Sequence, residues 1–151
     1  MDIGTPIKNF TLPDQSEKIH SLEGYRGKKV LVYFYPKDMT SGCTVEAQQF
    51  RDNLKKFEAL NVQIIGISKD SVKSHAKFAE KESLNFPILA DTEMKVSTQF
   101  GVWVEKSMYG RKYMGIQRDS FLIDEKGNLE KHYVKVKPKD HVQQVLADLG
   151  A

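Results

Sequence analysis

The chain has 151 residues, enough for one domain over residues 1–151 with a single hydrophobic core, and its 23 Lys and Arg residues against 20 Asp and Glu residues give a net charge of +3. The basic residues form no run, which argues against nucleic acid as a partner. No stretch approaches the roughly 18 apolar residues of a membrane span, and the first residues lack the apolar segment of a secretory signal, so we expect a cytoplasmic protein with no membrane partner.

Segments typical of strands and helices alternate along the chain. Runs rich in β-branched and aromatic residues predict buried strands at 28–35 and 61–68, a short strand at 85–91, and a hairpin formed by 115–124 and 128–136. Apolar residues at three- and four-residue steps predict helices at 44–60, 71–83, 92–100 and 139–150. Ser71 is a suitable N-cap for the second of these helices.

The order of these elements predicts an α/β fold. Two parallel strands joined through a helix form a βαβ unit, and the antiparallel hairpin that follows completes a mixed central sheet flanked by helices. This is the arrangement of a thioredoxin-like sandwich. The first 27 residues are expected to form an N-terminal β-hairpin extension.

The only cysteine of the chain, Cys43, lies where the helix at 44–60 is expected to begin. Unpaired N–H groups at a helix N-terminus favour negative charge, and the thiolate is the reactive form of cysteine. Thr40 offers a hydroxyl nearby, Gly42 lets the backbone come close, and Pro36 fixes the turn into the loop and shields the site from water on one side. The structural alternative is a small buried cysteine with no chemistry, as many free cysteines are.

Two segments resemble the peroxiredoxins. Pro36, Thr40 and Cys43 in PKDMTSGC match the PxxxTxxC pattern of that family, and YFYPKDMTSGCTVEAQQFRD resembles the active-site segment of its bacterioferritin comigratory protein group, also called peroxiredoxin Q. FGVWVEKSMYGRKYMGIQRDSFLID resembles the second signature of the group, an aromatic loop leading into a strand that carries an arginine, here Arg118. The flanking FTLPDQ, GYRGKKVLVYF and NFPILAD segments extend the resemblance over nearly the whole chain.

The resemblance implies a thiol-dependent peroxidase without metal or other cofactor. The Cys43 thiolate attacks the O–O bond of a hydroperoxide and becomes a sulfenic acid. The backbone N–H of Cys43, the Thr40 hydroxyl and the Arg118 guanidinium would stabilise the charge that moves to the leaving oxygen. Asp119 follows Arg118, and strand alternation is expected to turn it to the other face. The four histidines show no metal-ligand spacing.

Smaller roles are expected for other residues around Cys43. With Gly42, Glu46 and Trp103 are assigned to the substrate pocket, although Glu46 in the first helical turn also fits ordinary helix design. Arg51 belongs either to the active-site network or to the solvated surface. Trp103, Tyr109 and Tyr113 wall the pocket or pack on the hairpin.

The sequence departs from the group at the position of its second cysteine. Many members carry that cysteine five residues after the first, where this chain has Gln48, and others carry it in the next helix, where 71–83 has none. An internal disulfide is therefore excluded, and the Cys43 sulfenic acid needs an external thiol from thioredoxin, glutaredoxin, a low-molecular-weight thiol or another subunit. Ser41 also replaces a common proline, which could loosen the loop.

Two alternatives share the same motif residues. In the first, the protein is a peroxide sensor whose oxidised Cys43 passes its oxidation to a partner protein by a mixed disulfide. In the second, the protein is a thioredoxin-fold binding module with an inert cysteine. We expect a monomer, because no apolar surface helix is left over to form a subunit contact.

Overall fold

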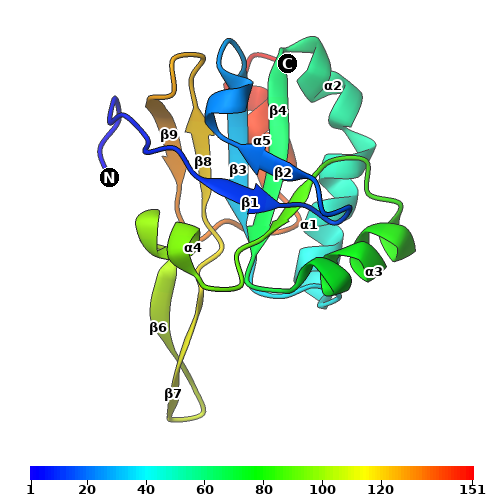
Figure 1. The fold of residues 1–151 in the computed structure, drawn as a ribbon, viewed down its shortest axis with the longest axis vertical. Coiled ribbons are helices and arrows are strands. Elements are labelled where there is room, and N and C mark those ends of the chain that lie inside the picture. The colour runs from blue at the N-terminus through cyan, green and yellow to red at the C-terminus, as the bar shows by residue number, and fades with distance from the viewer.

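A mixed sheet of five strands forms the centre of the molecule, which the computed structural model describes over all residues 1–151 (Figure 1). In spatial order the strands are β5 (Ile88–Ala90), β4 (Val62–Ser68), β3 (Lys29–Phe34), β8 (Ser120–Ile123) and β9 (Leu129–Tyr133). The pairs β3–β4 and β4–β5 are parallel, whereas β3–β8 and β8–β9 are antiparallel. This arrangement confirms the mixed sheet that the order of the sequence segments predicted.

The two faces of the sheet pack against different helices. The helices are α1 (Ser41–Asp52), α2 (Leu54–Ala59), α3 (Val72–Glu82), α4 (Lys95–Gln99) and α5 (His141–Asp148). A cluster of 17 buried residues on one face combines the sheet with side chains of α1, α2, α3 and α5, and it contains Cys43. A second cluster of 16 buried residues, on the other face, includes side chains from α4 and from the first 22 residues. No helix is long and apolar enough to cross a membrane.

The N-terminal extension is a short hairpin, as predicted. Strands β1 (Thr11–Pro13) and β2 (Ile19–Ser21) pair antiparallel and cross the sheet on the side away from α5, followed by a 3-10 turn, η1 (Glu23–Tyr25) (Figure 1). Asp14 stabilises the bend because its Oδ1 accepts hydrogen bonds from the backbone N–H groups of Ser16 and Lys18.

The helix expected at 44–60 is two helices that start earlier and break in the middle. Helix α1 begins at Ser41, and α2 follows a break at Asn53. The side-chain amide of Asn53 donates to the Gln49 carbonyl at 2.8 Å, a local bond of the kind by which asparagine competes with helical geometry. The earlier start places Cys43 in the first turn of α1.

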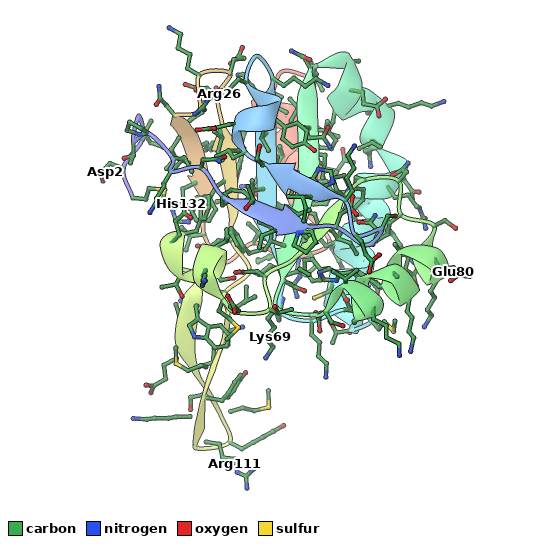
Figure 2. The ribbon with its side chains drawn as sticks, in the orientation of Figure 1. Asp2, Arg26, Lys69, Glu80, Arg111 and His132 are labelled. Atoms are coloured by element: carbon green, nitrogen blue, oxygen red, sulfur yellow. The ribbon has the colours of Figure 1, made fainter.

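The segment expected to be an aromatic loop is a second hairpin, formed by β6 (Trp103–Met108) and β7 (Arg111–Ile116). Both turn residues, Tyr109 and Gly110, have positive φ, the conformation of a tight two-residue hairpin turn. The hairpin projects from the body, and Arg111 lies at its far end (Figure 2). Most of its side chains are exposed, so no apolar alternation marked the strands in the sequence.

Candidate active site

Cys43 is buried under a helix start at the end of the central strand β3. The strand ends at Phe34, and the loop 35–40 leads into α1, whose third residue is Cys43. Its side chain belongs to the core, and the residue is only 1% exposed. Thr40 occupies the N-cap position with extended backbone angles, so the free N–H groups of the first turn surround the cysteine. This position favours the thiolate, and the chain has no other cysteine to pair with it.

Arg118 brings its guanidinium against the sulfur. Its Nη2 lies 3.4 Å from Cys43 Sγ, and its Nη1 donates to Glu46 Oε1 at 3.0 Å. Arg118 does not lie in a strand, as the sequence suggested, but in the link between β7 and β8. Its backbone carbonyl accepts from the N–H of Val136 at 2.8 Å, which fixes the link against the segment after β9.

Asp119 supports the same link, a role that was not predicted for it from the sequence. The residue is buried, and its Oδ1 accepts from the Lys135 backbone N–H at 2.9 Å and from Gln117 Nε2 at 3.0 Å. Its Oδ2 lies 2.8 Å from His132 Nε2. Asp119 therefore joins the link that carries Arg118 to the segment after β9.

Glu46 is a buried carboxylate and not a surface residue of the first helical turn. Glu46 lies in the second turn of α1 and is fully buried, as are Cys43, Ala47 and Phe50 of the same helix. Burial raises the pKa of Glu46 to about 7, although the ion pair with Arg118 acts in the opposite direction. Its Oε2 has no hydrogen-bond partner, and neither has the buried hydroxyl of Tyr33. The carboxyl group can therefore gain or lose a proton near neutral pH, close to the Arg118 guanidinium that contacts the Cys43 sulfur.

Gly42 lies where two other segments meet α1. A Cβ at this position would lie 3.3 Å from Arg118 Nη2 and 3.3 Å from Pro138 Cγ, closer than most side-chain contacts allow. The absence of a side chain thus lets Arg118 reach the sulfur. The Thr40 hydroxyl is exposed and donates to the Lys37 carbonyl at 2.8 Å, so in this structure it does not bond the sulfur. Pro36 is half-buried at the start of the loop.

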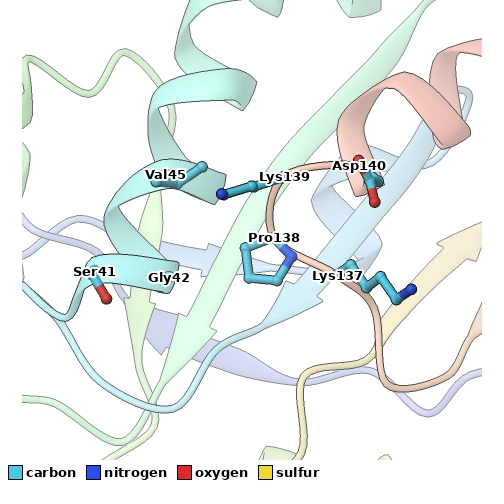
Figure 3. A pocket seen from close by; sticks show the side chains of 7 residues that line it. All are labelled: Ser41, Gly42, Val45, Lys137, Pro138, Lys139 and Asp140. Carbon is cyan, nitrogen blue, oxygen red and sulfur yellow. The ribbon is translucent and has the colours of Figure 1, made fainter.

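Two clefts lie near the Cys43–Arg118 contact, one lined by Gly42 and the other by Arg118. The first, of about 490 Å³, separates the start of α1 from the segment before α5, and Figure 3 shows its lining residues, Ser41, Gly42, Val45, Lys137, Pro138, Lys139 and Asp140. The second, of about 450 Å³, lies between the β6–β7 hairpin and Arg118, and it is lined by Val104, Glu105, Lys106, Ser107, Tyr113, Gln117, Arg118, Lys135 and Val136. The sequence analysis singled out neither Lys106 nor residues 135–140, because only the fold brings Lys106, Lys135 and Val136 beside Arg118 and residues 137–140 beside α1.

Trp103 and Arg51 lie away from the sulfur. Trp103 packs against the second core, on the opposite face of the sheet, with Lys69 Nζ 5.7 Å from its ring centroid. Its assignment to the substrate pocket stays a prediction. Arg51 Nη1 donates to the Glu82 carbonyl at 2.7 Å, and Gln48 Nε2 donates to Glu82 Oε1 at 2.8 Å. Arg51 and Gln48 thus both link α1 to the end of α3.

Asp38, Asp70 and His75 bring three ligand-type atoms within 4.8 Å of one another below the loop. Hydrogen bonds account for this geometry: His75 Nδ1 lies 2.7 Å from Asp38 Oδ2, and the Ser68 hydroxyl donates to Asp70 Oδ2 at 2.7 Å. We assign no metal to this cluster.

Comparisons with known proteins point to one family. The AhpC/TSA family model matches residues 3–132. The chain is 46% identical to peroxiredoxin Bcp of Bacillus subtilis over 149 residues, which cover 99% of this chain and 95% of the relative. It is 47% identical to peroxiredoxin Bcp of Escherichia coli over 143 residues, 95% of this chain and 92% of the relative.

Solved structures of related proteins match this chain in fold. A cysteine-to-serine variant of Xylella fastidiosa PrxQ matches with a TM-score of 0.95 and 34% identity, over 99% of this chain and 96% of that one. The Xanthomonas campestris bacterioferritin comigratory protein, studied for its alkyl peroxide reduction activity, matches with a TM-score of 0.89 and 36% identity, over 93% of this chain and 90% of that one. These matches confirm the thioredoxin-like fold.

Proposed function

Because the chain belongs to the AhpC/TSA family, in its Bcp or peroxiredoxin Q group, and is a thiol-dependent peroxidase, we propose that Cys43 is its peroxide-reactive thiol. The observation that carries this proposal is the 3.4 Å contact between Arg118 Nη2 and Cys43 Sγ at a helix N-terminus. Both the cation and the free N–H groups favour the thiolate.

In the proposed reaction the Cys43 thiolate attacks one peroxide oxygen. A sulfur–oxygen bond forms, the O–O bond breaks, and its electron pair leaves on the second oxygen, which takes a proton to become water or an alcohol. Arg118 offers N–H donors to the oxygen on which charge develops. The Thr40 hydroxyl donates its hydrogen bond to the Lys37 carbonyl, so its lone pairs are free to accept a hydrogen bond from the incoming hydroperoxide. Hydrogen peroxide and organic hydroperoxides are the expected substrates.

The second half of the cycle uses an external thiol, since Cys43 has no cysteine partner in the chain. The sulfenic acid condenses with a thiol RSH to a mixed disulfide and water, and a second thiol releases RSSR and the Cys43 thiol. Thioredoxin, glutaredoxin or a low-molecular-weight thiol can supply these equivalents. We propose that the protein works in this one-cysteine cycle as a cytoplasmic monomer.

The charges around the second cleft favour an anionic reductant. Lys106, Lys135 and Arg118 line it against one acidic residue, Glu105. Burial and the neighbouring Arg118 both lower the pKa of Lys106, because they make its positive charge less favourable. A thiol that carries a carboxylate, free or on an acidic protein surface, would offset their repulsion.

Intact mass spectrometry tests the function directly. After one equivalent of hydrogen peroxide, the parent protein is expected to gain one oxygen and lose it again with excess thiol, whereas Cys43→Ser gains none. An unchanged parent mass would contradict the proposal and favour an inert cysteine. Slow turnover with a trapped disulfide to another protein would instead support the peroxide sensor.

A further inference from the structure

The β6–β7 hairpin exposes large side chains close to the candidate active site. Tyr109, in its turn, is 99% exposed, and Met108, Tyr113 and Met114 are the other large hydrophobic side chains that it leaves exposed. The strands are buried only at the end next to the body. Tyrosine, methionine and arginine are enriched in protein–protein interfaces, so a projecting hairpin with these residues is a candidate docking surface.

The strand register places residues without a carboxylate on one face of this hairpin. Lys106 pairs with Tyr113, and Met108 pairs with Arg111. Directly paired residues of antiparallel strands lie on the same face, and Val104 lies on this face by alternation. We call Val104, Lys106, Met108, Arg111 and Tyr113 the basic face, because it carries two cations and no acidic residue.

The opposite face of the hairpin has a similar composition but different electrostatics. It carries Lys112 and Met114, which match Arg111 and Met108 of the basic face in kind. It also carries Glu105, whose Oε1 lies 3.7 Å from Lys112 Nζ. The positive charge of Lys112 is therefore partly balanced by a neighbour on its own face.

The topology places the basic face on the same side of the molecule as Cys43. Ser120, the first residue of β8, pairs with Tyr33 near the end of β3, and the loop to Cys43 leaves from that end. Residues 117–119 join the hairpin to β8, so the hairpin projects from this edge of the sheet (Figure 1). Three residues of the basic face line the second cleft together with Arg118 and two residues after β9.

Charge and shape distinguish between the possible occupants of this surface. A second copy of the chain would bring one basic face against another and would be repelled. A flat anionic membrane would meet the tip of the hairpin first and leave the cleft at its base unfilled. A protein with a protruding acidic surface can fill the cleft, contact the hairpin and offset the positive charge.

We propose that the basic face docks a dithiol protein that carries acidic residues around its thiols and reduces the Cys43 sulfenic acid. The proposal deepens the function proposed above and rests on it. One thiol of the partner condenses with the sulfenic acid to a mixed disulfide and water. The second thiol then displaces Cys43 as a thiolate, and the partner leaves as a disulfide. A small thiol can enter the cleft without contact to Met108 or Arg111 near the tip, so these two residues should affect the protein reductant alone.

Rapid-mixing kinetics can compare an acidic thioredoxin with 2-mercaptoethanol as reductants of the Cys43 sulfenic acid. In Met108→Ser and Arg111→Gln, we expect the ratio of the thioredoxin rate constant to the 2-mercaptoethanol rate constant to fall roughly three- to tenfold. Arg111→Gln should also weaken the salt dependence of the thioredoxin rate constant. Met114→Ser and Lys112→Gln are the matched controls on the opposite face, and they should leave the ratio within about twofold of the parent. Oxidation by hydrogen peroxide should be equal in all five proteins.

Several outcomes would overturn the proposal. Equal ratios in the four variants and the parent would exclude docking on the basic face. A parent that thioredoxin reduces no faster than 2-mercaptoethanol does would exclude a dithiol protein as the occupant. If the ratio stays unchanged while Met108→Ser abolishes binding to phosphatidylglycerol vesicles, or abolishes a dimer seen by sedimentation, the face belongs to a membrane or to a second copy. A parent that gains no oxygen from hydrogen peroxide would instead refute the function assigned to Cys43.

Discussion

Glu46 and Arg118 form an ion pair beside the Cys43 sulfur, although 72 residues separate them in sequence. Glu46 is fully buried, while the Arg118 side chain is 17% exposed. The carboxylate holds Nη1, which leaves Nη2 directed at Cys43 Sγ. The position of the guanidinium thus depends on a carboxyl group that is costly to bury.

Glu46→Gln should remove a pH dependence of stability. The pKa of Glu46 is about 7 in the folded protein and about 4.5 in the unfolded chain. Between these values the unfolded chain releases the proton first, so the parent loses on the order of 3 kcal/mol of unfolding free energy as pH rises from 4.5 to 7. The variant cannot release this proton, and its stability should fall less over the same range. Urea unfolding of both proteins at several pH values measures the difference.

The same substitution should slow the oxidation of Cys43. A neutral amide holds Arg118 less firmly than a carboxylate, and we expect the rate constant with hydrogen peroxide to fall roughly tenfold at pH 7 or above. Glu82→Gln is a suitable control, because Glu82 contacts the same helix through Gln48 but lies at the end of α3. Parallel pH profiles of this rate constant in the parent and Glu46→Gln would contradict a Glu46 pKa of about 7.

Gly42→Ala should impair chemistry more than stability. The added Cβ would lie 3.3 Å from both Arg118 Nη2 and Pro138 Cγ, so the guanidinium must shift by a few tenths of an ångström. Alanine also favours the helix by up to about 1 kcal/mol, which offsets the strain. We expect an unfolding free energy within about 1 kcal/mol of the parent and oxidation of Cys43 slowed roughly tenfold. Ser41→Ala, at the exposed neighbouring position, should change neither quantity.

The local parts of the site could be predicted from the sequence, because a continuous segment carries them. The loop from Pro36 and a helix start close to Cys43 follow from neighbouring residues. The buried side of α1 could be predicted in part, since Ala47 and Phe50, two of the apolar residues with helical spacing, are buried there. Glu46 was misplaced because the helix was expected to start later and because carboxylates are seldom buried.

The parts that could not be predicted join residues far apart in sequence. Asp38 and His75 are separated by 37 residues, and no local pattern indicates that their side chains meet. The buried hydrogen bonds of Asp119 were not predicted, because the residue was expected in a strand, where alternation would point its side chain to the face opposite Arg118. Arg118 was found through the family resemblance alone.

Lys106→Gln and Lys135→Gln should reduce the preference for anionic thiols. Both lysines line the cleft beside Arg118. In the parent, the positive charge of each lysine should raise the rate of reaction with mercaptoacetate relative to 2-mercaptoethanol. We expect each variant to lower this ratio roughly two- to fivefold, and added salt to lower it in the parent. Lys126→Gln serves as control, because that turn lies at the other end of β8. A ratio that neither substitution nor salt alters would exclude an anion site in this cleft.

Gln48→Cys should convert the one-cysteine cycle into an internal disulfide cycle. Residues five apart on a helix have Cα atoms about 9 Å apart, beyond the roughly 7 Å that a disulfide spans, so α1 must unwind before the two sulfurs meet. The substitution also removes the bond from Gln48 to Glu82, which ties α1 to α3. Intact mass after one equivalent of hydrogen peroxide should then show the loss of two hydrogens in place of the gain of one oxygen. A stable sulfenic acid in Gln48→Cys would show that α1 does not open on the timescale of the reaction.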